Sequence, residues 1–374
     1  MSSVKRDPRD GTWLARWRDP GGAQRKKSFR RRVDAERFLY DLMAEMARGF
    51  YIDPAAGKVS FRAVAARWSS SQMHLKASTS DRYTSIVRHH LLPKWGGWSV
   101  NRMETRDIAE WLNGLHTAGV SAGTVRKVHR VLSLILDASV ADALIGRNPA
   151  RGIRLLRQVA SPPRFLSGEE LGRLVNAAGA HADEIALLAV TGLRFGEFAA
   201  LRVGDFDAAR GRLMIRASVS VVGSSMVWTT PKTHRSREVS VPPSLVPALL
   251  SRSADRPTDA VLFTSANGQV LRLNNWRRRV FAPACETAGL SGLKPHDLRH
   301  TAASLAVRSG ANVKVVQRML GHASAAMTLD VYSGLFDDDL DVVALAMDAL
   351  VPQTCHIAGS VALDEQDGAA GQTR

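Results

Sequence analysis

The residues best suited to chemistry are two arginines, two histidines and a lysine, followed late in the chain by a tyrosine: Arg194, Lys232, His296, Arg299, His322 and Tyr332. A tyrosine hydroxyl can act as a nucleophile that forms a covalent intermediate. Arginine side chains match phosphate geometry with two parallel donors, and histidine or lysine can transfer protons. The combination predicts covalent phosphoryl transfer on a polyanion, with Tyr332 as the nucleophile.

Arg194 lies at the boundary between two predicted helices. The apolar run 185–190 predicts one helix, Thr191-Gly192 predicts a turn, and residues 194–202 predict a second helical run. The start of a helix leaves backbone N–H groups free, so an arginine there is well placed to hold a phosphate. A structural ion pair with Glu197 is the alternative for this side chain.

Lys232 lies between two runs with strand character, residues 212–222 and 237–241, which places it at or near a hairpin turn. An ordinary solvated turn lysine is the alternative. To donate a proton, the lysine needs burial or a partner charge that brings its pKa down from about 10.4. The neighbouring His234 and Arg235 are candidates for DNA contact.

His296 and Arg299 are three residues apart on a predicted helix that begins with Pro295, so both side chains project to one side. A His-x-x-Arg pattern alone is short, and it gains weight from the histidine and tyrosine that follow it. We expect Asp297 and His300 to orient this site rather than to act in it.

His322 and Tyr332 complete the set. Gly321 ends a predicted amphipathic helix, His322 follows it, and Tyr332 comes ten residues later. A free phenol has a pKa of about 10 and is a poor nucleophile, so neighbouring cations must stabilise the phenolate. Read alone, Tyr332 would be a packed aromatic residue, but its order and spacing after His322 favour the nucleophile.

These motifs, in this order, resemble those of the tyrosine recombinase (phage integrase) family over nearly the whole chain, and the C-terminal half resembles integrases of actinobacterial phages. The resemblance implies that Tyr332 attacks a DNA phosphorus, leaving a 3′-phosphotyrosyl link and a free 5′ hydroxyl. Arg194 and Arg299 would grip the non-bridging oxygens, and Lys232 would protonate the leaving 5′ oxygen.

The same resemblance assigns the histidines and the partners. His296 would accept or donate a proton near the tyrosine oxygen, and His322 would hydrogen-bond the scissile phosphate. The arginines replace the metal of other phosphoryl-transfer enzymes, so neither a metal nor a cofactor is expected. The implied partner is double-stranded DNA, at core and arm-type attachment sites. Strand exchange implies a homotetramer on DNA, with a host DNA-bending factor as an accessory partner.

Charge supports a polyanionic partner. The 374 residues include 51 Lys and Arg against 35 Asp and Glu, a formal net charge of +16. Residues 1–32 hold 11 basic and 3 acidic residues, a net of +8, whereas residues 337–374 hold 8 acidic residues and Arg374. The residues between them therefore carry +15, so the basic surface extends through the body of the protein. A merely solvated basic surface is the alternative.

Turn and linker signals predict a multidomain protein, mainly α with small β-sheets. Residues 1–53 read as a small sheet with strands at 13–18 and 24–29 and a helix at 33–48, and the resemblance implies arm-type DNA binding. Residues 53–58 resemble a linker. Residues 58–153 predict a helical unit whose second helix stops before Pro93, similar to the core-binding (SAM-like) domain of the family.

A second linker at 154–164 precedes a mixed α+β catalytic domain over 164–350, and we expect 351–374 to be disordered. An apolar helix at 340–350 could pack in cis or on a neighbouring protomer. Candidate DNA-contact residues outside the catalytic set are basic side chains of the first two domains: Arg16, Arg18, Arg25, Lys26, Lys27, Arg82, Arg126, Lys127 and Arg130.

Other classes of protein fit less well. No stretch of about 18 apolar residues predicts a membrane span, and the N-terminus lacks the apolar core of a secretory signal. The two cysteines, Cys285 and Cys355, form no disulfide framework and have no zinc-ligand spacing. A reducing cytosol therefore fits, and the resemblance implies the bacterial host cytosol and association with the nucleoid.

Three alternatives remain beside a phage or mobile-element integrase. A host-type chromosome resolvase shares the chemistry but usually lacks the extra basic N-terminal domain. A type IB topoisomerase would relax DNA without exchanging strands. A non-cutting DNA-binding or architectural protein belongs to another class, and the complete set of six residues argues against it.

Overall fold

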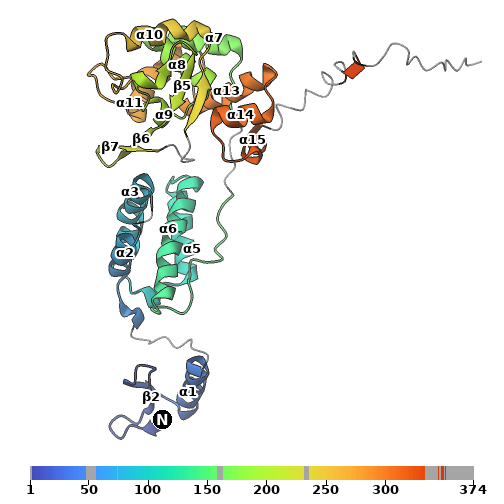
Figure 1. The fold of residues 1–374 in the computed structure, drawn as a ribbon. Coiled ribbons are helices and arrows are strands. Elements are labelled where there is room, and N and C mark those ends of the chain that lie inside the picture. The colour runs from blue at the N-terminus through green and yellow to red at the C-terminus, as the bar shows by residue number, and fades with distance from the viewer. Residues whose placement is uncertain are drawn as a thin grey trace, which may run out of the picture. The chain divides into compact units, whose positions relative to one another are not determined.

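The computed structural model describes residues 2–47, 56–73, 75–157, 163–230 and 236–332, with four isolated residues between 344 and 350. The chain divides into two compact units, residues 1–161 with 220–227 and residues 162–219 with 228–374. Helices dominate the described residues, and the sheets are small (Figure 1). This confirms the predicted fold class.

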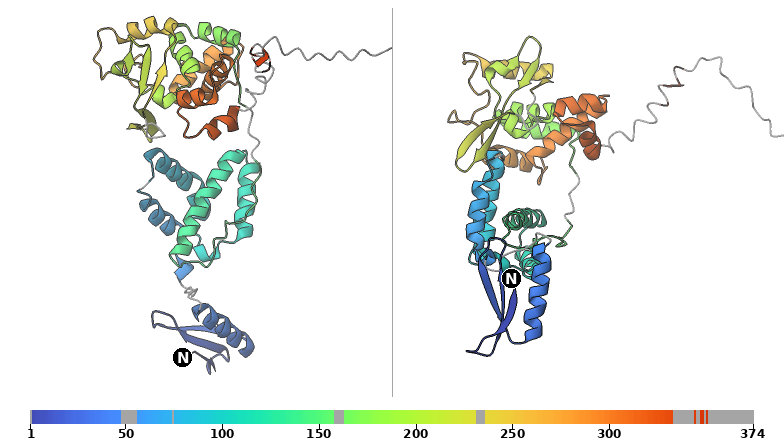
Figure 2. Two further views of the ribbon diagram at one scale, coloured as in Figure 1. Left: turned by 45° about the vertical axis from the view of Figure 1, so that its right-hand side comes forward. Right: turned by 60° about the horizontal axis from the view of Figure 1, so that its bottom comes forward.

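The N-terminal segment is a three-stranded antiparallel sheet with one helix, α1 (Arg32–Ala47), along one face (Figure 2). Its strands follow the order β1 (Ser3–Arg6), β2 (Trp13–Arg18) and β3 (Gln24–Phe29). Strands β2 and β3 agree with the predicted runs, whereas β1 was not predicted. Ala15 and Trp17 alternate along β2 and pack on Leu39 and Leu42 of the helix, because every second side chain of a strand faces the same side.

The rest of the first unit is helical. Its longer helices are α2 (Phe61–Ser70), α3 (Ala77–Ile86), α5 (Thr105–Thr117) and α6 (Ala122–Ala141). Ser60 and Ser121 cap α2 and α6 with their hydroxyl oxygens. Apolar positions at helical spacing, such as Phe61, Ile108 and Leu132, form a common core. Residues 56–58, expected to be linker, form a short 3₁₀ turn in which Gly57 is buried.

The expectation that the second helix stops before Pro93 is wrong. The helix α3 continues through a π-helical turn (Val87–Leu91) into α4 (Leu92–Trp95). The Leu92 N–H donates to the carbonyl of Val87, five residues earlier. The resulting shift puts Pro93 at the start of a new helical segment, where its missing N–H costs nothing.

The second unit surrounds a sheet of order β4-β5-β8 with helices on the flanks. Its strands are β4 (Phe206–Asp207), β5 (Arg212–Ile215) and β8 (Arg237–Ser240). A separate two-stranded hairpin of β6 (Ser218–Val222) and β7 (Ser225–Thr229) includes residues 220–227 of the first unit. The predicted run 212–222 is therefore two strands in different sheets, and β7 was missed. The helices that position the site are α7 (Gly168–Ala177), α8 (Ala182–Thr191), α9 (Phe195–Phe198), α13 (Pro295–Arg308), α14 (Val313–Leu320) and α15 (Ala325–Tyr332).

Shorter helices complete the second unit: α10 (Val246–Ser253), α11 (Leu273–Trp276) and α12 (Ala282–Thr287). The helical run expected at 194–202 is shorter than predicted and ends at Phe198. No helix among the described residues is long and apolar enough to cross a membrane. Lys232, His234, Arg235, most of the predicted 340–350 helix and the 351–374 tail lie outside the described residues.

Candidate active site

Arg194 is held at the junction of two helices. Gly192 ends α8 with φ +63°, a left-handed conformation that suits glycine, and Arg194 then serves as the N-cap of α9. Its backbone N–H donates to Oε2 of Glu197 at 3.0 Å, and its Nη1 donates to Oε1 at 2.9 Å. The ion pair with Glu197 is thus present, while the Arg194 side chain remains 26% exposed.

Glu197 lies between two arginines. Its side chain is 1% exposed, and it also pairs with Arg237 of β8, whose Nη2 lies 2.6 Å from Oε2. Burial raises the pKa of Glu197, but the hydrogen bonds and charges of Arg237 and Arg194 outweigh it, so the pKa lies below its ordinary value. A buried carboxylate between two guanidinium groups is therefore ionised and fixes both of them.

Arg299 hydrogen-bonds two segments of the site that are far apart in the sequence. It is 3% exposed, and its Nη1 donates to the carbonyl of Gly192 at 2.5 Å while Nη2 donates to the carbonyl of Leu320 at 2.7 Å. Burial and the charge of Arg194 lower the pKa of Arg299 to about 9, which leaves it charged at neutral pH. One guanidinium thus joins the Arg194 turn to the end of α14, and three of its five N–H groups remain for other acceptors.

Tyr332 ends α15 and is 1% exposed. It packs with Val316 and Leu320 of α14, and its hydroxyl lies 2.9 Å from Nδ1 of His300. Burial raises the pKa of Tyr332, while the charge of Arg299 acts in the opposite direction. In this arrangement the nucleophile candidate is both a packed aromatic residue and a partner of a histidine.

His296 and His300 lie one helical turn apart on α13, with ring centroids 5.0 Å apart. His296 reaches the surface although protein atoms surround much of its ring, whereas His300 is half-buried. Desolvation, then the charges of His300 and Arg299, lowers the pKa of His296, and desolvation likewise lowers that of His300. Both rings are therefore neutral at pH 7, and each can accept a proton.

His322 follows Gly321, which ends α14 with φ +65°. Its Nδ1 lies 2.9 Å from the hydroxyl of Thr328, a buried residue of α15. Burial, followed by the positive charges of Arg299 and Arg194, lowers the pKa of His322 to about 4. The Thr328 contact fixes the ring orientation and leaves Nε2 free of any partner among the described residues.

Five of the six predicted catalytic residues therefore lie near one another, joined by hydrogen bonds, a ring contact between His296 and His300 and the charges of Arg194 and Arg299, and Lys232 lies outside the described residues. The histidine that contacts Tyr332 is His300, which we expected only to orient the site. Arg237 was not predicted at all. Its ion pair joins residues 40 positions apart, and no local pattern could reveal such a contact.

The predicted DNA-contact residues of the sheet fall on two faces. Arg16 is paired across β2 with Ser3 and Lys26, so Arg16, Arg18 and Lys26 share the face opposite α1. Lys5, opposite Leu14, joins this open basic face, although the sequence did not single it out.

The other two predicted contacts of the sheet lie on the α1 side. Arg25 is an ion-pair partner of Asp19 at 3.0 Å. Lys27 lies 4.5 Å from the centre of the Phe38 ring of α1. Both side chains therefore have contacts within the domain itself.

The predicted contacts of the helical part also differ from one another. Arg82, Lys127 and Arg130 are exposed on α3 and α6. Arg126 of α6 instead donates from Nη2 to the carbonyl of Leu156 at 2.5 Å. This bond holds the segment that follows α6 against the helix. The role of Arg126 in the folded chain is thus at least partly structural.

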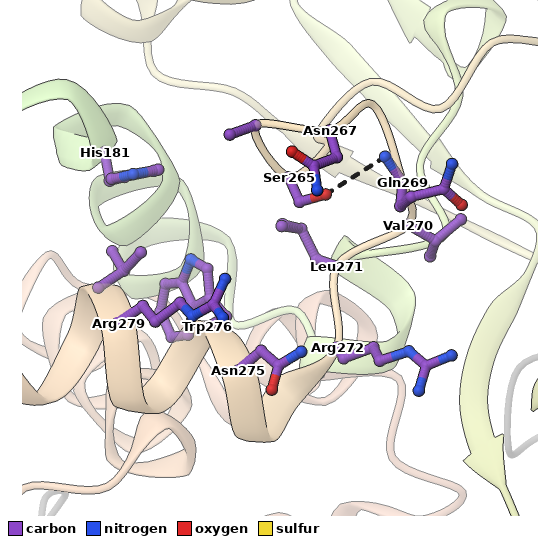
Figure 3. Close-up of a pocket in the computed structure, with 12 residues that line it drawn as sticks. His181, Ser265, Asn267, Gln269, Val270, Leu271, Arg272, Asn275, Trp276 and Arg279 are labelled. Atoms are coloured by element: carbon purple, nitrogen blue, oxygen red, sulfur yellow. Dashed lines mark hydrogen bonds between the residues drawn. The ribbon is translucent and has the colours of Figure 1, made fainter. Parts of the chain in front are cut away.

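A pocket of about 400 Å³ lies elsewhere in the second unit, beside Trp276 and Arg279 (Figure 3). The five described catalytic candidates do not line it. Trp276 donates from its indole nitrogen to Glu184 at 2.6 Å, and the Gln269 N–H donates to the Ser265 hydroxyl at 3.3 Å. Across the described ranges, no cluster of three or more His, Cys, Asp or Glu side chains could hold a metal ion.

Comparison with known proteins shows which proteins this chain resembles. The profile of the Phage integrase family matches residues 164–338. An integrase of prophage phiRv2 from Mycobacterium tuberculosis is 29% identical over 351 residues, covering 90% of this chain and 92% of the relative. The ICEBs1 integrase of Bacillus subtilis is 24% identical over 333 residues, covering 83% of this chain and 89% of the relative.

Two groups of solved structures share the fold. The Tn1549 transposon integrase in complex with a circular intermediate DNA superposes with a TM-score of 0.65 at 20% identity, covering 78% of this chain and 99% of the other. A lambda integrase dimer bound to a COC′ core site superposes with a TM-score of 0.58 at 19% identity, covering 90% and 94%.

Proposed function

We propose that this chain, a tyrosine-type site-specific DNA recombinase whose residues 164–338 match the Phage integrase family, integrates or excises a phage or mobile element through a 3′-phosphotyrosyl intermediate on Tyr332. The observation that carries the proposal is that Tyr332 contacts His300, while Arg299 joins the turn before Arg194 to the end of α14 just ahead of His322. A chromosome resolvase or a non-cutting architectural protein is less favoured, since the first relatives are integrases of prophages and mobile elements.

The first step transfers the DNA phosphorus from its 5′ oxygen to the tyrosine. The Tyr332 oxygen forms a bond to phosphorus, the bond to the 5′ oxygen breaks, and the phenol proton passes to His300 at 2.9 Å. The neighbouring ring of His296 offers a route for that proton to solvent. The 5′ oxygen takes a proton from Lys232, which gives a free 5′ hydroxyl.

Positive charge and hydrogen bonds stabilise the transition state. Arg194 retains guanidinium N–H groups that Glu197 does not use, and these would bind one non-bridging oxygen. The remaining N–H groups of Arg299 and the free ring nitrogen of His322 would bind the other. Attack by a 5′ hydroxyl from a second duplex then reverses the step, conserving the bond energy without ATP.

Double-stranded DNA is the substrate, and exchange between two duplexes needs four protomers, a homotetramer on DNA. The basic face of Lys5, Arg16, Arg18 and Lys26 would bind arm-type sites, because a major groove admits a β-sheet ribbon. The exposed Arg82, Lys127 and Arg130 would contact core-site phosphates, and a host DNA-bending factor would join distant sites. The protein would act in the bacterial host cytosol at the nucleoid.

Covalent trapping tests the chemistry directly. Labelled duplex DNA from beside the gene, nicked so that the cut end diffuses away, would be incubated with wild type and Tyr332→Phe, with and without host extract. A denaturing gel should show a protein–DNA adduct for wild type alone. DNA binding without any adduct, even with extract, would instead support a non-cutting DNA-binding role.

A further inference from the structure

Arg237 uses all three of its guanidinium nitrogens inside the site. It is the first residue of β8, and its side chain is 11% exposed. Nη1 and Nη2 donate to Oε1 and Oε2 of Glu197 at 3.1 and 2.6 Å, and Nε donates to the carbonyl of Met319 at 3.1 Å. The side chain therefore joins three parts of the site: the sheet, the helix start at Arg194 and the end of α14.

Both carboxylate oxygens of Glu197 accept hydrogen bonds from two arginines. Arg237 binds both carboxylate oxygens as a fork, while Arg194 places a backbone N–H on Oε2 and a single guanidinium nitrogen, Nη1, on Oε1. Within the described residues, Nη2 and Nε of Arg194 have no hydrogen-bond partner. A buried carboxylate that had lost its fork would draw in the nearest guanidinium, because Arg–carboxylate pairs favour bidentate geometry.

We infer that Arg237 is a positioning residue that keeps Arg194 free to bind the scissile phosphate. By holding both oxygens of Glu197, Arg237 limits Arg194 to one guanidinium bond and leaves Nη2 and Nε available to DNA. Without Arg237, Arg194 would close its own fork on Glu197 and withdraw from the phosphate. The inference rests on the proposed function, because it assigns Arg194 to phosphate binding.

The packing around Arg237 fits a fixed rather than a mobile side chain. A Cβ added to Gly321 would lie 3.0 Å from Cδ, Nε and Nη1 of Arg237, so the guanidinium lies directly against the turn that carries His322. The hydrogen bond from Nε to the carbonyl of Met319 holds the same turn. Arg237 thus fixes the backbone before His322 together with the side chain of Arg194.

Kinetics of adduct formation test the inference with Arg237→Gln and Arg237→Lys. We expect unchanged affinity for DNA and a cleavage rate about 100-fold lower for glutamine, since small misplacement of a binding group costs that much. Lysine, which keeps the charge but not the fork, should lie in between. The matched control is Arg252→Gln, which removes a partly buried arginine fork on Asp183 in the same unit and should leave cleavage unchanged.

A methylphosphonate at the scissile position separates positioning from loss of structure. This substrate lacks the charge on one non-bridging oxygen, so it depends less on Arg194. The difference in rate between wild type and Arg237→Gln should therefore shrink on it. An equal fold-loss on phosphate and methylphosphonate would mean that Arg237 only supports the fold, and would overturn the inference.

The crystal structure of Arg237→Gln decides the question without any activity. We expect both terminal nitrogens of Arg194, or Nη and Nε, to bind Glu197. An Arg194 that keeps only its Nη1 bond would overturn the inference. If wild type forms no adduct, the proposed function fails, and the position of Arg194 in this variant still decides what Arg237 does.

Discussion

Tyr332 must satisfy two opposed physical demands. Its burial and its contact with His300 hold the ring in one place but raise the pKa of the phenol, which disfavours the anion that attacks phosphorus. The charge of Arg299 acts in the opposite direction. Proton removal during attack, rather than ionisation beforehand, therefore suits this site, and the neutral ring of His300 is the acceptor within reach.

Substitution of His300 distinguishes a proton acceptor from a mere anchor. An asparagine keeps a polar atom near the position of Nδ1 but cannot take up a proton, whereas phenylalanine keeps only the ring. If His300 is the acceptor, as we propose, both variants should lower the rate of adduct formation by about 10²–10⁴-fold. The rate would be measured by single-turnover trapping on nicked DNA.

The asparagine variant can also contradict the role of His300 as proton acceptor. A hydrogen bond that only orients Tyr332 contributes about 1 kcal/mol, roughly a fivefold rate difference, and asparagine should restore most of it. Near-normal cleavage by His300→Asn would therefore show that the histidine orients Tyr332, and that the proton leaves by another route.

The pH response of His322 follows from its surroundings. Its pKa of about 4 in the folded protein lies below the value of about 6.5 expected in the unfolded chain. The neutral ring therefore stabilises the fold fully above pH 6.5, and this contribution is lost as the pH falls toward 4. NMR titration of the His322 ring should give a midpoint near pH 4 in the native protein and near 6.5 in urea. Equal midpoints would contradict the burial of this ring beside Arg299.

At the scale of elements, the sequence predicts what local patterns encode. The spacing of apolar residues predicted the helices, Gly192 predicted the turn before Arg194, and Pro295 predicted the start of α13. The π-helical turn before Pro93 and the division of 212–222 into two strands depend on tertiary packing. Contacts such as Arg237 with Glu197 join distant parts of the chain, so periodicity carries no trace of them.

The turn after α14 offers a test at this scale. Gly321 and Gly310 both have positive φ, +65° and +83°, but only at Gly321 would a Cβ meet Arg237, at 3.0 Å. Alanine at either position should cost about 1–2 kcal/mol of stability from the left-handed backbone. Gly321→Ala alone should also displace Arg237 and lower cleavage. Thermal unfolding and adduct rates would be measured together. Equal cleavage rates for the two variants would show that the turn at Gly321 does not affect cleavage through Arg237.

At the scale of the whole molecule, the charge is distributed in a way that suits a protein with more than one DNA contact region. The first 32 residues carry +8 and the chain between them and residue 337 carries +15. Each phosphate neutralised by a basic side chain releases counterions, so affinity falls steeply with salt. Basic regions in the sheet, the helical part and the catalytic unit would therefore each add to the slope of log affinity against log salt.

The two faces of the N-terminal sheet allow that contribution to be measured. Lys26 lies on the open face with Arg16, whereas its neighbour Lys27 lies on the α1 side near Phe38. On duplex DNA that carries an arm-type site, Lys26→Ala should reduce the slope of log affinity against log salt by about 0.9, the value for one lost phosphate contact. Lys27→Ala removes the same charge and should lower thermal stability slightly while leaving the slope unchanged. Because both variants have the same net charge, a difference in slope can only come from the face on which the lysine lies. A wild-type slope for Lys26→Ala would show that Lys26 makes no phosphate contact and would contradict the prediction.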